Sequence, residues 1–192
     1  IRASAQMISY EIAMGMSVVP LFMLVGDLNL GAVTDYQSNG AWLIFKQPLA
    51  FVIFLVAAFA ETNRLPFDLP ESETELVSGY HTEYSSMKFA LFFIGEYAAM
   101  ISVSALMVTL FLGGWTLPFM GLDSPATTIF GGLVHIGIFI AKLGLFMGLF
   151  IWVRWMLPRF RYDQLMDLGW KRFLPLALLN IVITASWLWF TH

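Results

Sequence analysis

The chain has 192 residues, of which 59% are hydrophobic and only 12% are charged, and its formal net charge is −3. Soluble globular domains usually carry about 25% charged residues, so these values exclude an ordinary water-soluble enzyme. The chain has no cysteine, which excludes disulfides, thiolate metal sites and iron–sulfur ligation by its own residues. We therefore expect an all-α protein that lies within a membrane.

Five apolar runs are long enough to cross a bilayer, whose hydrocarbon core of about 30 Å requires about 20 apolar residues in helical form. The sequence thus predicts one polytopic transmembrane domain over 1–192, with five helices joined by short polar connections. Because Ile1 begins in mid-pattern, we also expect a carboxyl-terminal fragment of a longer protein. The five expected helices are 7–25, 42–60, 87–112, 129–157 and 173–190.

Basic residues are distributed unequally over the connections between these helices. Connections 61–86 and 158–172 contain all the basic loop residues, whereas connections 26–41 and 113–128 contain none. By the positive-inside rule, the first two connections are cytoplasmic. Their basic residues are Arg64, Arg159, Arg161, Lys171 and Arg172.

Ionisable residues inside the expected helices are candidates for proton transfer. Glu96 follows Met87 by nine residues, which places it about 13 Å deep and near the midplane. An ionised carboxylate there is costly unless it is paired or hydrated; the alternative is a neutral acid that bonds to a neighbouring helix. Glu11 lies one turn into the first helix. Lys142, near the middle of the fourth, suits either a proton path or a structural ion pair, and His135 is more typical of a satisfied interior histidine.

The connection 61–86 contains six carboxylates and is strongly acidic. Two prolines, Pro66 and Pro70, fix the backbone around Phe67 and Asp68, which indicates a shaped segment, although a solvated loop is the simpler alternative. Together with Glu11 and Glu96, these carboxylates form a plausible chain for protons, which is typical of pumps and transporters. The six are Glu61, Asp68, Glu71, Glu73, Glu75 and Glu83.

The connection also carries a specific motif. Residues 60–71 read Ala-Glu-Thr-Asn-Arg-Leu-Pro-Phe-Asp-Leu-Pro-Glu, and the segment continues with Gly79-Tyr80 and Glu83-Tyr84-Ser85. This stretch resembles the H subunit of bacterial respiratory complex I, the family of mitochondrial NADH dehydrogenase subunit 1. Further matches cover most of the chain, at Ser9-Tyr10-Glu11, Glu96-Tyr97, Gly113-Gly114-Trp115 and Arg161-Tyr162-Asp163-Gln164-Leu165-Met166.

The resemblance implies a multi-pass subunit of a proton-translocating NADH:quinone oxidoreductase in the bacterial inner (cell) membrane. Such a protein forms part of the quinone chamber and couples quinone reduction to proton translocation through an acidic funnel. It contacts the peripheral quinone-site subunits, the membrane-arm subunits and lipid, but no nucleic acid. Ubiquinone or menaquinone is its substrate, and it carries no iron–sulfur cluster, flavin, metal or catalytic residue of its own.

The resemblance also assigns roles to individual positions. The proton path it implies is Glu11, Glu61, Glu71, Glu73, Glu75, Glu83 and Glu96. The quinone-binding residues it implies are Arg64, Phe67 and Asp68.

Three alternatives remain open at this point. A related membrane subunit of a hydrogenase- or ferredoxin-linked complex would share the fold and the acidic funnel. A secondary transporter would require inverted repeats, and the five expected helices show no such symmetry. A purely architectural anchor would leave Glu96 without a role.

Overall fold

The computed structural model describes residues 2–62, 67, 87–117, 128–158 and 160–191. The elements in these ranges are all helical, as expected. Four helical stretches are long and apolar enough to cross a membrane: Gln6–Val25, Met87–Phe111, Ile129–Met156 and Tyr162–Thr191. The first is part of α1 (Arg2–Val25), the second and third are α5 (Met87–Phe111) and α6 (Ile129–Met156), and the fourth ends in α8 (Leu174–Thr191). This confirms a helical protein with several potential membrane spans.

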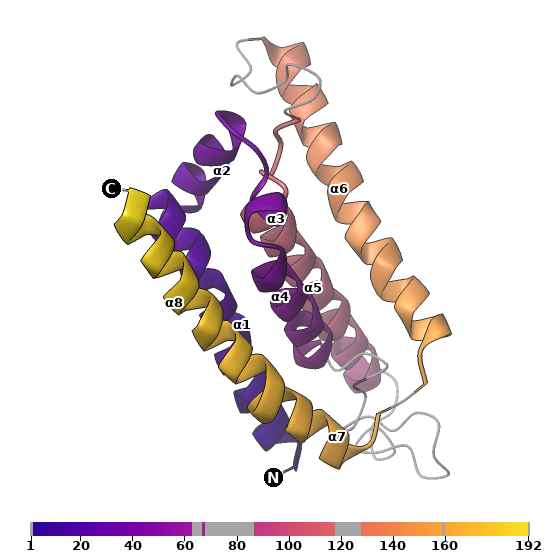
Figure 1. Ribbon diagram of the computed structural model, residues 1–192. Helices are drawn as coiled ribbons and strands as arrows, with labels where there is room; N and C mark the ends of the chain where they lie inside the picture. The colour runs from indigo at the N-terminus through magenta and orange to yellow at the C-terminus, as the bar shows by residue number, and fades with distance from the viewer. Residues whose placement is uncertain (1, 63–66, 68–86, 118–127, 159, 192) are drawn as a thin grey trace.

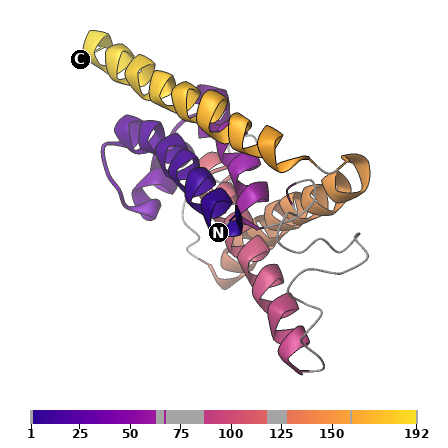
Figure 2. The same cartoon turned by 90° about the horizontal axis from the view of Figure 1, so that it is seen from below.

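Helix α1 forms the centre of the packing and lies along both α8 and α4 (Pro48–Glu61), as Figures 1 and 2 show. Small side chains fill the positions where these helices meet: Ala13 of α1 and Ala57 and Ala58 of α4 have no exposed surface. Alanine allows two helix backbones to approach closely, which is how membrane helices gain packing contacts without help from water.

Aromatic rings connect α4 to the other two long helices. The ring of Phe111 in α5 lies 5.3 Å from that of Phe51 and 5.6 Å from that of Phe54, measured between centroids. On α6, the ring of Phe150 lies 4.2 Å from that of Phe59. These edge and tilted contacts bury the face of α4 that does not contact α1.

The expected helix over 42–60 is interrupted. It consists of the short helix α3 (Leu43–Lys46) and of α4, which has only 14 residues. Pro48 causes the break, because proline has no N–H to donate and its ring displaces the carbonyl of the preceding turn. The side chain of Gln47 at the break bonds to α8: its Nε2 donates to Thr184 Oγ1 at 3.0 Å, and its Oε1 accepts from Asn180 Nδ2 at 3.0 Å.

Two expected connections also contain helix. Residues 26–41 include α2 (Leu30–Ser38), which Asn29 caps by accepting a hydrogen bond from the backbone N–H of Gly31 at 2.9 Å. Residues 158–172 become helical at Tyr162, where α7 (Tyr162–Asp167) begins, and a π-helical segment (Leu168–Phe173) joins α7 to α8. The fifth expected helix therefore starts about three turns early.

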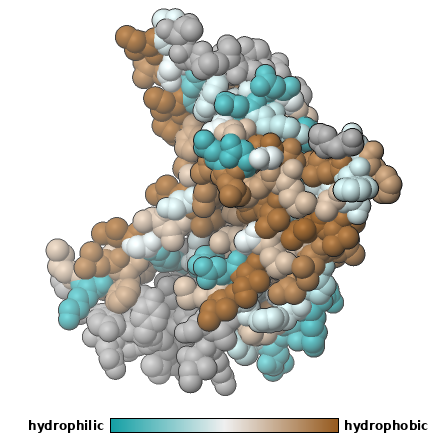
Figure 3. All heavy atoms as spheres, turned by 90° about the vertical axis from the view of Figure 1, so that its left-hand side faces the viewer, coloured by the Kyte–Doolittle hydropathy of each residue, from teal (hydrophilic) through white to brown (hydrophobic). Residues whose placement is uncertain are grey.

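The outer faces of the bundle are apolar. Large side chains such as Phe45, Trp155 and Trp189 are more than half exposed. In Figure 3, hydrophobic residues form a broad band over one face, with hydrophilic residues mostly above and below it. A surface of this kind suits contact with lipid or with further protein, because its exposure to water would be unfavourable.

Candidate functional site

A buried glutamine joins the amino-terminal end of α1 to the carboxyl-terminal end of α4. Gln6 has no exposed surface, and its Nε2 donates to the backbone carbonyl of Ala60 at 3.4 Å and to that of Phe67 at 3.1 Å. Its Oε1 is buried without a hydrogen-bond partner among the described residues. The amide of Gln6 thus attaches the end of α4 and the following segment to the start of α1.

Two of the predicted proton-path residues lie at this junction. Glu61 is the last residue of α4 and is half-buried, and its Oε2 is enclosed without a hydrogen-bond partner in the described part of the chain. Glu11, on α1, is exposed, and its charge interacts with that of Glu61. The structure therefore places Glu11 and Glu61, which are 50 residues apart in the sequence, close enough for their charges to interact.

Glu96 lies on a different helix, α5, where it is half-buried and its Oε1 is enclosed. The other predicted residues of the proton path, Glu71, Glu73, Glu75 and Glu83, lie outside the described residues.

Of the predicted quinone-binding residues, only Phe67 is described; Arg64 and Asp68 are not. Phe67 is 4% exposed, and its ring lies 6.0 Å from that of Tyr10 and 5.5 Å from that of Phe160. Tyr10 in turn donates its hydroxyl to the carbonyl of Leu165 at 2.8 Å. Phe67 is therefore packed between α1 and the chain that enters α7.

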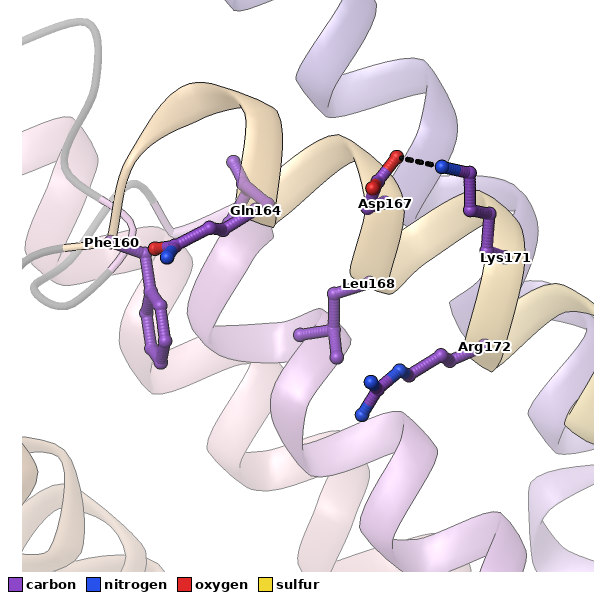
Figure 4. Close-up of a pocket in the computed structure, with 7 residues that line it drawn as sticks. Phe160, Gln164, Asp167, Leu168, Lys171 and Arg172 are labelled. Carbon is purple, nitrogen blue, oxygen red and sulfur yellow. Dashed lines mark ion pairs between the residues drawn. The ribbon is translucent and has the colours of Figure 1, made fainter.

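A pocket of about 400 Å³ opens beside this junction, along α7 and the π-helical segment. In Figure 4, Phe160 and Leu168 supply its apolar lining, and Lys171 pairs with Asp167 at 2.8 Å. Sequence reasoning missed this pocket, because it treated 158–172 as a connection. The run of basic residues with aromatic neighbours was the available signal.

Lys142 and His135 lie away from the acidic pair. The ammonium of Lys142 donates to backbone carbonyls at the end of α5, and His135 packs its ring against Trp115 at 4.5 Å between centroids. Among the residues that the structure describes, no group of three His, Asp or Glu side chains could hold a metal ion.

These features define a class: a helical protein with several candidate membrane spans, in which the carboxylate of Glu61 stands at a helix end near the packed ring of Phe67. The particular family follows from comparison of the sequence with known proteins. The model of the NADH dehydrogenase family matches residues 1–185, so the chain belongs to that family. This confirms the resemblance that residues 60–85 indicated.

Relatives with curated names agree with this result. The chain is 53% identical over 189 residues to the NADH-quinone oxidoreductase H subunit 1 of Cytophaga hutchinsonii, an alignment that covers 97% of the chain and 54% of the relative. It is 53% identical over 184 residues to the protein of the same name from Geobacter sulfurreducens, an alignment that covers 96% of the chain and 49% of that relative. NADH-quinone oxidoreductase subunit 8 of Rhodothermus marinus is 49% identical over 194 residues, an alignment that covers 96% of the chain and 57% of that relative. The chain spans about half the length of these relatives.

Proposed function

We propose that the chain is a carboxyl-terminal part of the membrane-embedded H subunit of a proton-translocating NADH:quinone oxidoreductase in a bacterial inner membrane. It forms part of the quinone chamber and couples reduction of ubiquinone or menaquinone to proton translocation. The names of its relatives support the quinone and NADH assignments over a hydrogenase- or ferredoxin-linked complex. The other subunits of that complex supply the redox centres and cover its exposed apolar faces.

We further propose that α3 and α4 together make a fifth membrane span. In Figure 1, α1 and α5 run in the same direction, and α4 runs in the opposite direction between them. The chain must return to the inner side between α1 and α5, and the α3–α4 segment is the part that does so. The bonds from Gln47 to α8 support this span, because they satisfy the polar side chain at the break and join it to a neighbouring helix. Connections 61–86 and 158–172 are then cytoplasmic.

The observation that carries the coupling proposal is the carboxylate of Glu61, which is enclosed at the end of α4 with the charge of Glu11 nearby. A change of charge close to an enclosed carboxylate alters the free energy of protonating it. Gln6 joins the end of α4, where Glu61 stands, to the carbonyl of Phe67; Arg64 and Asp68, the proposed quinone-binding residues, belong to the same stretch of sequence. Binding or reduction of quinone at that segment therefore acts directly on the end of α4.

The proposed proton path continues from this pair along the acidic connection and to Glu96. Its further members are Glu71, Glu73, Glu75 and Glu83. No residue of this chain is proposed as a redox or catalytic group.

The test uses the complete complex in sealed proteoliposomes, with Glu61→Gln and Glu96→Gln as separate variants. NADH-driven quinone reduction and proton uptake are measured side by side. We expect each variant to assemble and to move fewer protons per electron pair, because glutamine keeps the shape of the side chain but cannot accept a proton. Asp35→Asn is the matched control, since Asp35 is exposed on α2. Normal proton uptake in both glutamine variants would contradict the proposal.

A further inference from the structure

A second set of polar side chains lies at the other end of α5, away from the acidic pair. Gln37 and Thr116 have no exposed surface, and His135 is 9% exposed. Trp42 and Lys142 complete the set. By the charge distribution of the loops, this end of α5 faces the outer side of the membrane.

The ammonium of Lys142 is the centre of this set. Its Nζ donates to the carbonyls of Leu112 at 2.7 Å, Gly114 at 3.0 Å and Thr116 at 2.6 Å. Three carbonyl acceptors require three N–H donors, which only the protonated amine possesses. The Nζ atom also lies 4.8 Å from the ring centroid of Trp42, a cation–π distance. The geometry therefore requires a positively charged Lys142.

The carbonyls converge because α5 ends in a glycine turn. Gly113 and Gly114 have φ values of +67° and +58°, and the N–H of Thr116 bonds back to the carbonyl of Gly113 at 3.0 Å. Glycine adopts this conformation without strain, and the turn directs the terminal carbonyls towards α6. Leu112, Gly114 and Thr116 follow the last residue of α5, and buried carbonyls of such a turn need a donor from a neighbouring element.

A positive charge is not needed merely to donate hydrogen bonds to the carbonyls at this end of α5. On the same helix end, the neutral amide of Gln37 donates to the carbonyls of Thr109 at 3.1 Å and Leu110 at 3.2 Å. In the described part of the chain, no carboxylate lies within ion-pair distance of Lys142. The positive charge at this end therefore has a consequence beyond filling hydrogen bonds.

We propose that Lys142 is an electrostatic barrier that keeps protons from crossing between the outer side and the proton path of this subunit. Phe111, at the end of α5, lies 15 residues beyond Glu96, or about 22 Å along the helix. The buried polar side chains at this end could admit water, and a fixed positive charge among them repels hydronium, as fixed charges do in water-selective pores. This inference rests on the proposed function for its purpose, but the barrier itself does not depend on electron transfer.

The experiment measures passive proton flux into proteoliposomes that contain the assembled complex, without NADH, under a potassium diffusion potential. Lys142→Gln keeps hydrogen-bond donors and removes the charge, Lys142→Met removes both, and Lys142→Arg keeps both. We expect proton flux to increase about tenfold in the Gln and Met variants. The electrostatic energy between a unit charge and a nearby hydronium ion is larger than the energy difference that corresponds to a tenfold change in flux. The Arg variant should remain tight.

Lys46→Gln is the matched control, because Lys46 is an exposed lysine that bonds only the Tyr36 hydroxyl, at 3.0 Å, and lies over its ring. Its flux should equal that of the unchanged complex. Equal flux in Lys142→Gln would overturn the barrier. Loss of assembly in both neutral variants but not in Lys142→Arg would also overturn it, in favour of a purely structural cap.

The two proposals fail separately. If Glu61→Gln and Glu96→Gln pump normally while Lys142→Gln leaks, the proposed coupling path is wrong and the barrier stands. If the glutamic acid variants lose pumping while Lys142→Gln stays tight, the barrier is wrong and the coupling path stands.

Discussion

The hydrogen bonds of Gln47 predict a specific result in a double-mutant cycle with Asn180. Gln47→Leu removes two bonds between helices, to Thr184 and to Asn180, whereas Asn180→Leu removes only the second. Such bonds between membrane helices contribute about 0.6 kcal/mol each on average. We therefore expect destabilisation of about 1.2 kcal/mol for Gln47→Leu and about 0.6 kcal/mol for Asn180→Leu.

The double variant distinguishes this arrangement from independent effects. Because Gln47→Leu already removes both bonds, adding Asn180→Leu should cost little more, and the coupling energy should be about 0.6 kcal/mol. The assay follows thermal dissociation of the purified complex in detergent. Ser186→Ala is the control, since this exposed hydroxyl bonds only within its own helix, to the carbonyl of Val182 at 2.8 Å. If the double variant equals the sum of the single ones, the two side chains do not interact.

Three further predictions use the same dissociation assay. Tyr10→Phe should destabilise the complex by about 1 kcal/mol, because it removes the buried bond to the carbonyl of Leu165 at 2.8 Å and keeps the ring; unchanged stability would contradict that bond. Ala57→Leu should cost about 1 to 3 kcal/mol, since Ala57 has no exposed surface for a larger side chain; a neutral effect would show that α4 can shift. Gly113→Ala should destabilise strongly, because its Cβ would lie 2.5 Å from a threonine hydroxyl, whereas Gly144→Ala, with nothing within 4 Å, should be tolerated; equal effects would refute this.

The long helices can be predicted from the sequence because hydrophobic length is a strong signal. The sequence predicts helices over 87–112 and 129–157, and the structure has them at Met87–Phe111 and Ile129–Met156. Their ends are set by the loss of the apolar pattern and by local residues such as Gly113. These are properties of the chain near each boundary, so no distant contact is needed to find them.

The break at Gln47 requires distant information. Pro48 is visible in the sequence, but a proline inside an apolar run is tolerated in membrane helices when a neighbour satisfies the freed backbone. The side chain of Gln47, at the break, bonds to Asn180 and Thr184 on α8, more than 130 residues away, and no spacing in the sequence shows these partners. Helix α2 escapes prediction for a different reason: it is short and only weakly apolar, and its main local signal is the capping residue Asn29.

The candidate site is predictable in its composition but not in its arrangement. The motif in 60–71 indicates the family, and its carboxylates indicate a proton path. Sequence spacing cannot show that Glu11 reaches Glu61, because that contact depends on how closely α1 and α4 pack. Lys142 lies near the middle of α6, as the sequence predicts, but spacing cannot show that its ammonium bonds the turn at the end of α5, past which α6 extends (Figure 1).

The charge of Lys142 opposes the field at the carboxyl-terminal end of α5, which supports the proposed barrier. The end of a helix carries about half a negative elementary charge, which attracts protons and other cations. Lys142 brings one full positive charge to the carbonyls just beyond this helix end, which exceeds the partial negative charge there. Removing the charge of Lys142 therefore abolishes the repulsion of hydronium and also restores the attraction of cations to the negative end of the helix. A neutral donor at position 142 would satisfy the carbonyls and still leave this attraction, so the hydrogen bonds and the charge have separable effects on proton flux.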